Sequence, residues 1–316
     1  MVFKLGIVVI GSLNMDMVVR TNRAPNAGET LMGQAFALSP GGKGANQAVA
    51  AARLGAEVSM IGSVGKDTFG SEMLEIIKQE GIHIEHISVS ETEATGVASI
   101  VIEEDGENRI IVVSGANMEL SAEDIQMLAP VIQQAKLIVL QLEMDLAMTE
   151  QAVAIAHGYG IPIILNPAPA RRLKDEMLSQ VTYLTPNETE AGILAGMTVD
   201  SIETAEQAAR ILLQKGVKNV IVTLGAKGTL LVNAEGTKLV PGFPVKAIDT
   251  VAAGDSFNGA LAQQLVSGKS LEEALRFANA VGALAVGKAG AIPSLPYLPE
   301  VENFIKHVSD DKELKS

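Results

Sequence analysis

The stretch LIVLQLEMDLAMTEQAVAIAHGYGIPIIL, residues 137–165, contains the pattern that decides the fold. An apolar run at Leu137–Leu142 is followed by helical periodicity at Met148–His157 and by a second apolar run at Pro162–Leu165. A strand, a helix and a strand in this order are typical of parallel strands joined by a crossover helix. Both runs are almost wholly apolar, as expected of strands with two buried faces. The unit predicts a parallel sheet with helices on both sides.

The same rhythm extends over the chain. Further strand-like runs are Leu5–Ile10, Val58–Ile61 and Val220–Thr223, and further amphipathic stretches are Asn46–Leu54, Phe69–Glu80 and Ala205–Lys215. The last third is helical in pattern, with helices expected at Gly254–Val266, Ser270–Val286 and Pro299–Val308. We therefore predict an α/β fold with a doubly wound, mostly parallel sheet, forming one domain over residues 1–308, and a charged tail at 309–316.

Four extended segments interrupt this rhythm. Met15–Arg20 and Leu31–Leu38 flank a polar turn, and Thr95–Ile102 and Arg109–Val113 flank Asp105-Gly106, a dipeptide typical of hairpins. We interpret the four, at about 15–40 and 95–113, as a small second sheet inserted into the α/β domain. The alternative is that they are edge strands of the main sheet.

Composition excludes several classes of protein. The chain of 316 residues has 24 Lys and Arg against 37 Asp and Glu, a net charge of −13, which disfavours binding to nucleic acid. It contains no cysteine, so disulfides, thiolate metal sites and cysteine nucleophiles are excluded. No apolar run approaches the roughly 18 to 20 residues needed to cross a membrane, and the first residues do not resemble a signal peptide. We expect a cytoplasmic protein without a membrane or nucleic-acid partner.

Several common motifs are absent. Gly268-Lys269-Ser270 resembles the end of a P-loop, but Gln263 stands where the first glycine is required. The Gly-x-Gly-x-x-Gly pattern of dinucleotide-binding proteins does not occur. His83 and His86 lack an evident third ligand, which argues against a zinc site.

The first positive signal is the segment GGKGANQA, residues 41–48, which precedes a helix expected to begin near Asn46. Glycine lets the backbone approach a ligand closely, and a helix N-terminus offers free N–H groups. Lys43 adds a positive charge and Asn46 adds a donor and an acceptor. The segment is suited to a polar ligand such as a polyol, although a strand-to-helix turn without a ligand would have the same glycines.

The second signal is the segment DTVAAGDSF, residues 249–257, which leads into a helix. Its small residues let successive N–H groups point into open space, which makes an anion site. Asp255 lies in the first helical turn, beside that site. A carboxylate there suits a general base next to a transferred phosphoryl group. The alternative is a carboxylate that only stabilises the helix dipole, by about 0.3 to 1 kcal/mol.

These two segments identify a resemblance to the ribokinase-like carbohydrate kinases, also called the PfkB family. Further matching segments are Asn14-Met15-Asp16, Gln141-Leu142-Glu143, Asn166 to Ala170, Thr185 to Glu190 and Thr223-Leu224-Gly225. The resemblance extends over about residues 5 to 308 without a large insertion or deletion. It implies a doubly wound fold with a β-sheet lid formed by the inserted strands.

The resemblance also implies an activity: transfer of the γ-phosphoryl group of MgATP to the 5-hydroxyl of D-ribose. Asp255 would be the base, and the backbone N–H groups of Ala252, Ala253, Gly254 and Asp255 would form the anion hole. The sugar would contact Asn14, Asp16, Gly42, Lys43, Asn46, Glu143 and Asp255.

On the nucleotide side, the family resemblance implies contacts from Asn187, Thr223, Gly225, Lys227, Gly228, Gly254 and Asn279. Glu190 would orient Mg²⁺ through water molecules. From spacing alone, the alternative is that Asn187 and Glu190 are a helix-capping pair. A K⁺ ion is implied beside the anion hole, at Asp249, Val251, Ala285, Lys288, Gly290 and Ser294.

In this family the lid covers the sugar and two lids pair, so the resemblance implies a homodimer. Alternatives to D-ribose remain open: another sugar or a nucleoside as acceptor, or a sugar sensor without catalysis. A nucleoside would call for aromatic stacking, which a chain with 3% aromatic residues and no tryptophan provides poorly. A sensor would not need Asp255.

Overall fold

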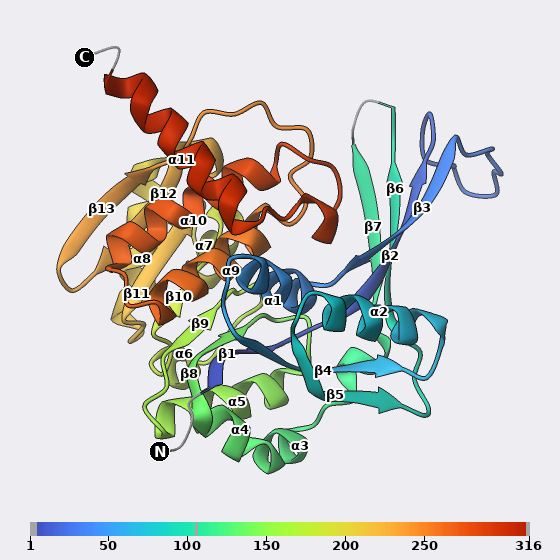
Figure 1. Cartoon of the computed structure of the whole chain (residues 1–316), viewed down its shortest axis with the longest axis horizontal. Coiled ribbons are helices and arrows are strands. Elements are labelled where there is room, and N and C mark those ends of the chain that lie inside the picture. Colours follow the sequence, from blue (N-terminus) through green and yellow to red (C-terminus); the bar gives the residue numbers. More distant parts are fainter. Residues whose placement is uncertain (1–4, 105–106, 314–316) are drawn as a thin grey trace.

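A nine-stranded sheet forms the centre of the computed structural model, which describes residues 5–104 and 107–313 (Figure 1). Its strand order is β13-β12-β11-β10-β9-β8-β1-β4-β5. The strands are β1 (Leu5–Ile10), β4 (Val58–Gly65), β5 (His83–Ser90), β8 (Ala135–Leu140), β9 (Ile163–Leu165), β10 (Tyr183–Leu184), β11 (Asn219–Thr223), β12 (Gly228–Asn233) and β13 (Gly236–Pro241).

Neighbouring strands from β5 to β11 run parallel, which confirms the fold class expected from the sequence. Strands β12 and β13 form an antiparallel hairpin at one edge. The sequence analysis did not identify this hairpin, which lies between β11 and the long C-terminal helices.

Helices cover both faces of this sheet and create two cores. On one face lie α1 (Lys43–Arg53), α2 (Thr68–Gln79), α9 (Ala253–Val266), α10 (Leu271–Ala285) and α11 (Leu298–Glu313). On the other lie α3 (Ala122–Met127), α4 (Ala129–Gln134), α5 (Leu146–Gly158), α6 (Asp175–Leu178), α7 (Glu188–Ala195) and α8 (Ile202–Gln214). In β1, Ile7 and Val9 enter the first core while Val8 and Ile10 enter the second, because strand side chains alternate. This is why the strand is apolar throughout.

Several helix boundaries differ from the sequence-based expectation, and two of them concern the site and the tail. Helix α1 begins at Lys43, three residues before Asn46, because Gly42 serves as its N-cap with a φ of 90°. Helix α11 continues to Glu313, so most of the expected tail at 309–316 is helical, and residues 314–316 lie outside the described range.

The interrupting segments form a separate four-stranded sheet in the order β3-β2-β6-β7, which we call the lid. Its strands are β2 (Asn14–Arg20), β3 (Ala35–Gly41), β6 (Gly96–Ile102) and β7 (Asn108–Val113). The idea that they are edge strands of the main sheet is wrong, and the lid stands out on one side of the molecule (Figure 1). Residues 105 and 106, the expected hairpin turn between β6 and β7, lie outside the described residues.

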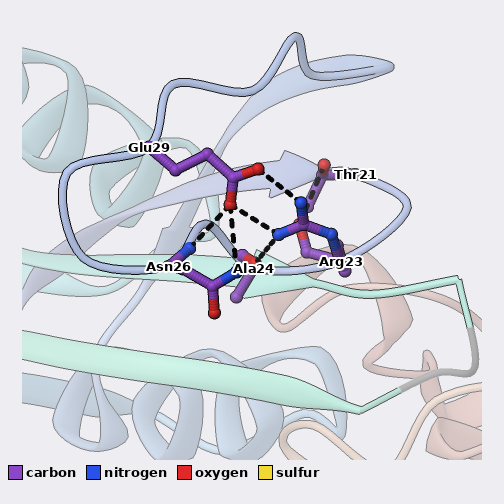
Figure 2. Close-up of polar contacts among 5 residues, drawn as sticks. All are labelled: Thr21, Arg23, Ala24, Asn26 and Glu29. Atoms are coloured by element: carbon purple, nitrogen blue, oxygen red, sulfur yellow. Dashed lines mark hydrogen bonds and ion pairs between the residues drawn. The ribbon is translucent and has the colours of Figure 1, made fainter.

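The connection between β2 and β3 is held by a polar cluster (Figure 2). The guanidinium of Arg23 forms an ion pair with Glu29, whose Oε2 also accepts from the backbone N–H of Asn26 at 3.0 Å. The Arg23 side chain also donates to the carbonyl of Ala24 at 3.1 Å. The hydrogen bonds from Arg23 lower the pKa of Glu29 to about 2. Strand β3 begins at Ala35, four residues later than the start at Leu31 that the sequence suggested.

Within residues 5–104 and 107–313, no helix is both long enough and apolar enough to span a bilayer.

The buried strands determine stability in a way that can be measured. Ile138 on β8 is fully buried, whereas Ile193 on α7 is 48% exposed. We expect Ile138→Ala to lower the free energy of unfolding by about 2 to 5 kcal/mol, because it leaves a cavity between sheet and helices. Ile193→Ala is the matched control, with an expected change below about 0.5 kcal/mol. Urea denaturation measures both, and equal losses would contradict the assignment of the core.

Candidate active site

The candidate site lies at the carboxyl ends of the parallel strands. The strand order reverses at β1, which has β4 on one side and β8 on the other. Such a reversal opens a crevice in which α/β proteins bind ligands. Asn14 follows β1, Glu143 follows β8 and Asn187 follows β10, so sequence-distant polar residues meet at this edge.

All the residues predicted to contact a sugar line one cavity of about 400 Å³. They are Asn14, Asp16, Gly42, Lys43, Asn46, Glu143 and Asp255. The lid supplies apolar residues to the same cavity, namely Ala98, Ile100, Ile110 and Val112. A polar floor and an apolar cover suit a small polyhydroxy ligand that must be separated from water.

The turn before α1 shapes one wall of the cavity. A Cβ atom on Gly42 would lie 2.8 Å from the backbone nitrogen of Asn14 and 2.8 Å from the carbonyl oxygen of Ser12. Only glycine can make this approach at a positive φ. Beyond the turn, Glu143 accepts from the backbone N–H of Lys43 at 3.1 Å and from the hydroxyl of Ser12. The carboxylate of Glu143 is thereby anchored to the start of α1.

The side-chain amide of Asn14 has a defined orientation in the cavity. Asn117, in the turn Gly115–Met118, donates from its side-chain nitrogen to Oδ1 of Asn14 at 2.8 Å. The same residue bonds both backbone groups of Leu13. With its oxygen occupied, Asn14 keeps its amide N–H groups for a ligand. The sequence analysis missed Asn117, because an isolated Asn about a hundred residues from its partner gives no local signal.

The carboxyl group of Asp16 has a pKa far from its usual value. It lies on β2 and is buried, and Glu143 and Asp255 are nearby negative charges. Burial, with these two charges as smaller contributions, raises the pKa of Asp16 from 3.8 to about 7. Lys43 opposes this effect, and its own pKa is raised chiefly by Asp255. The site thus concentrates four carboxyl groups around the ammonium group of Lys43, namely those of Asp16, Glu143, Glu190 and Asp255.

Asp255 is fixed by two amide side chains from α1. Its Oδ2 accepts from Asn46 at 2.9 Å and its Oδ1 accepts from Gln47 at 2.9 Å. The side-chain oxygen of Asn46 is buried without a partner among the described residues. This unsatisfied acceptor lies in the cavity lining and suits a ligand hydroxyl.

The start of α9 offers backbone donors beside Asp255. Its N-cap, Ala252, has a φ of 60° and is the one non-glycine residue with positive φ among those described. No described acceptor bonds the backbone N–H groups of Ala252, Gly254 and Asp255. The expected contribution of Ala253 is weaker, since its N–H donates to Thr250 at 3.3 Å. The predicted anion hole therefore has three free donors and one that is already engaged.

A second cavity, of about 620 Å³, adjoins the first. It contains six of the seven residues predicted on the nucleotide side: Asn187, Thr223, Gly225, Gly228, Gly254 and Asn279. Gly254, Asn187 and Thr223 line both cavities, so the two meet at the start of α9. Lys227 is the exception: it does not line the cavity, and its ammonium lies 4.0 Å from Glu188 at the rim.

The second cavity also has an apolar part that sequence reasoning did not identify. Phe243, Val245, Ala247, Ala283 and Val286 line it, drawn from the segment after β13 and from the end of α10. These residues lie in an irregular segment and a helix end, where periodicity gives no signal for a ligand. Asn279 uses its amide N–H groups on the carbonyls of Val240 and Pro241, which leaves its oxygen for a ligand.

Asn187 and Glu190 form the capping pair that spacing alone left open. The side chain of Asn187 accepts from the N–H of Glu190 at 2.8 Å, and the carboxylate of Glu190 accepts from the N–H of Asn187 at 2.9 Å. Glu190 nevertheless lines the first cavity, and burial raises its pKa. A capping carboxylate that faces a cavity fits an outer-sphere contact to Mg²⁺, so the two interpretations are compatible.

Asp249 links the two loops predicted to hold K⁺. Its Oδ1 accepts from the N–H of Val251 at 3.0 Å and its Oδ2 from the N–H of Gly290 at 2.9 Å. Within the described residues no Lys or Arg pairs with this carboxylate, and Lys288 pairs with Glu300 instead. The carboxylate and the loop carbonyls are hard oxygen donors, so these residues fit a monovalent cation. Ser294 directs its hydroxyl to the carbonyl of Ala291.

Comparison with known proteins decides the family. The family model for pfkB family carbohydrate kinases matches residues 4–298. The chain belongs to the pfkB family of carbohydrate kinases. The family match covers nearly the whole described chain, lid included, and it confirms the resemblance drawn from the two glycine-rich segments.

Relatives of this pfkB-family kinase are similar over almost their whole length. A ribokinase from Haemophilus influenzae is 44% identical over 95% of this chain and 98% of its own. A deoxyribokinase from Salmonella typhi is 39% identical over 95% of this chain and 99% of its own. The structure of Arabidopsis thaliana ribokinase complexed with ribose and ATP superposes with a TM-score of 0.89 at 34% identity, covering 96% of this chain and 99% of that one.

The burial of Asp16 predicts a pH-dependent stability. Because the folded-state pKa is raised above the unfolded value, the native protein binds the proton more tightly between these two values. Asp16 therefore costs stability increasingly as the pH rises toward 7. We expect the stability of Asp16→Asn relative to the unaltered kinase to increase by about 2 to 3 kcal/mol between pH 5 and pH 8. Urea denaturation at both pH values measures it.

Glu302→Gln, at an exposed position of α11, is the control variant for this experiment. A constant difference between Asp16→Asn and the unaltered kinase across this pH range would contradict the perturbed state of Asp16.

Proposed function

We propose that this kinase is a ribokinase, which transfers the γ-phosphoryl group of ATP to the 5-hydroxyl of D-ribose and yields D-ribose 5-phosphate and ADP. One observation carries the proposal: Asp255 and the free N–H groups of α9 lie where the two cavities meet. A base and a set of anion-binding donors are thus placed between a polyol site and a nucleotide-sized site. We also propose that the reaction takes place in the cytoplasm, one of the compartments that supply ATP.

In the proposed reaction, Asp255 takes the proton of the 5-hydroxyl while the oxygen of this hydroxyl attacks the γ-phosphorus. The bond from the γ-phosphorus to the bridging oxygen breaks and ADP leaves. The N–H groups of Ala252, Gly254 and Asp255 bind oxygens of the transferred phosphoryl group and stabilise its charge. Lys43 lies among Asp16, Glu143 and Asp255 and balances their charge.

Two cations support this reaction in our proposal. Glu190 would hold Mg²⁺ through water, and the Mg²⁺ would neutralise phosphate charge. Asp249 and the carbonyls of Val251, Ala285, Lys288, Gly290 and Ser294 would hold K⁺ at the loop preceding α9. The hydrogen bonds of Asp249 to both loops support this, since a cation there would fix the backbone that leads to Ala252.

The substrate is tested by ADP release with a panel of acceptors: D-ribose, 2-deoxyribose, fructose, adenosine and no acceptor, each with and without K⁺. We expect turnover with D-ribose, increased by K⁺. The deoxyribokinase relative makes 2-deoxyribose the main competitor. Preference for 2-deoxyribose would overturn the substrate while leaving the kinase family intact. Binding of D-ribose without phosphorylation of any acceptor would favour a sensor.

Asp255→Asn tests the base. We expect its kcat to fall by about 10²- to 10⁴-fold, because the amide cannot accept the proton. The KM for D-ribose should change much less, since the remaining cavity residues still bind the sugar. An unchanged kcat would contradict the role of Asp255.

We further propose that two copies associate through their lids to form a homodimer. By register, Phe36 and Leu38 of β3 lie on the same face as Ile111 and Val113 of β7, opposite to the face that lines the cavity. All four are exposed, and Ile111 is 69% exposed. A contiguous apolar face that reaches both edge strands needs a partner, and a second lid offers the same apolar surface.

Ile111→Lys tests the dimer, because a charge in the middle of this face would have to be buried on association. We expect the unaltered chain to sediment as a dimer and the variant as a monomer. Ile193→Lys, an equal change at an exposed position of α7, should leave the dimer intact. A monomeric unaltered chain would refute the proposal.

A further inference from the structure

Two buried glutamines lie behind Asp255, outside both cavities. Gln47 of α1 is 0% exposed and Gln141, which follows β8, is 1% exposed. The side-chain nitrogen of Gln47 donates to Asp255 at 2.9 Å and to Asn166 at 3.2 Å. Its oxygen accepts from the side-chain nitrogen of Gln141 at 2.7 Å. A continuous chain of hydrogen bonds therefore runs from Gln141 through Gln47 to the carboxylate.

The chemistry of the three side chains fixes which group donates and which accepts in each of these hydrogen bonds. A carboxylate only accepts hydrogen bonds, so Gln47 must turn its NH₂ group toward Asp255. Its oxygen then faces Gln141, which must in turn present its own NH₂ group. The oxygen of Gln141 is consequently buried without a partner among the described residues.

An unpaired buried oxygen is costly, and an apolar side chain at position 141 would avoid it. Its retention is explained if the NH₂ group of Gln141 has a task, which is to hold the amide of Gln47 in the orientation that donates to Asp255. Such control is needed because the terminal torsion of an aspartate is soft and has no sharp rotamer of its own.

We propose that Gln141 and Gln47 are positioning residues that fix the plane of the Asp255 carboxylate. Gln47 holds Oδ1 while Asn46 holds Oδ2 from the cavity side, so the carboxylate cannot rotate. The free lone pairs of Asp255 then face the acceptor hydroxyl before the sugar binds. Gln141 acts only through Gln47. This inference rests on the proposed kinase function of the site.

Gln47→Met and Gln141→Met test the pair, since methionine keeps the length of glutamine and removes its donors. Because neither glutamine lines the sugar cavity, the KM for D-ribose should stay within about threefold while kcat falls by about 10- to 100-fold. A rise in KM with unchanged kcat in either variant would overturn the proposal.

The double variant Gln47→Met/Gln141→Met separates positioning from a general loss of structure. If Gln141 acts through Gln47, the double variant should be as slow as Gln47→Met alone, because the second change has nothing left to disturb. Independent, multiplying losses of kcat would overturn the relay.

Thermal unfolding supplies the folding control. In Gln141→Met the unpaired oxygen of Gln141 disappears while that of Gln47 becomes unpaired, so we expect Tm to change little. A fall in kcat that follows a fall in Tm would point to a structural role only.

A crystal structure of Gln47→Met needs no activity and separates this inference from the proposed function. Inactivity of the unaltered chain toward D-ribose would overturn the function alone. An Asp255 carboxylate that keeps one orientation in Gln47→Met would overturn the relay alone, and we expect more than one orientation.

Discussion

The hydrogen bonds from α1 to Asp255 join parts of the chain 208 and 209 residues apart. They require the two helices to lie unusually close. A Cβ atom on Gly259 of α9 would be 2.6 Å from the carbonyl oxygen of Gln47 and 2.6 Å from the Cβ of Ala50. Any larger residue at 259 would separate the helices and draw Asp255 away from its amide partners. The cavities, the base and the free backbone donors all depend on this one close contact.

The backbone at the start of α9 supports the same arrangement at a cost. Ala252 occupies the left-handed region, which costs a non-glycine residue about 1 to 3 kcal/mol. This conformation turns the chain abruptly into the helix and leaves the N–H groups of Gly254 and Asp255 without acceptors among the described residues. The carboxylate of Asp249 accepts hydrogen bonds from the backbone N–H groups of Val251, which precedes Ala252, and of Gly290. These bonds offset part of the strain. The anion site is therefore built in advance of any ligand.

The sequence alone supplied most of the fold and much of the site. Apolar runs identified the parallel strands because β1 and its neighbours are buried on both faces. The family resemblance identified residues that the structure brings together in the smaller cavity. The β12–β13 hairpin and the apolar wall at Phe243 were not predicted from the sequence, since short edge strands and irregular segments carry no periodic signal. The contact of Asn117 with Asn14 and the orientation of Gln47 were not predicted for another reason. Their hydrogen-bond partners lie about a hundred residues away, and tertiary packing determines which residues meet. Lys227 was assigned to the nucleotide side, but its side chain lies at the rim.

Asp16 lies on β2, the strand through which the chain passes from the main sheet into the lid. A residue of the proposed sugar site is thus part of the sheet that covers the cavity. Any displacement of the lid relative to β1 carries this carboxylate with it, whereas Asp255 stays with the helices of the main domain. In our proposal, a movement of the lid that opens the cavity therefore also moves Asp16 away from the sugar, so that opening of the cavity and release of the product occur together.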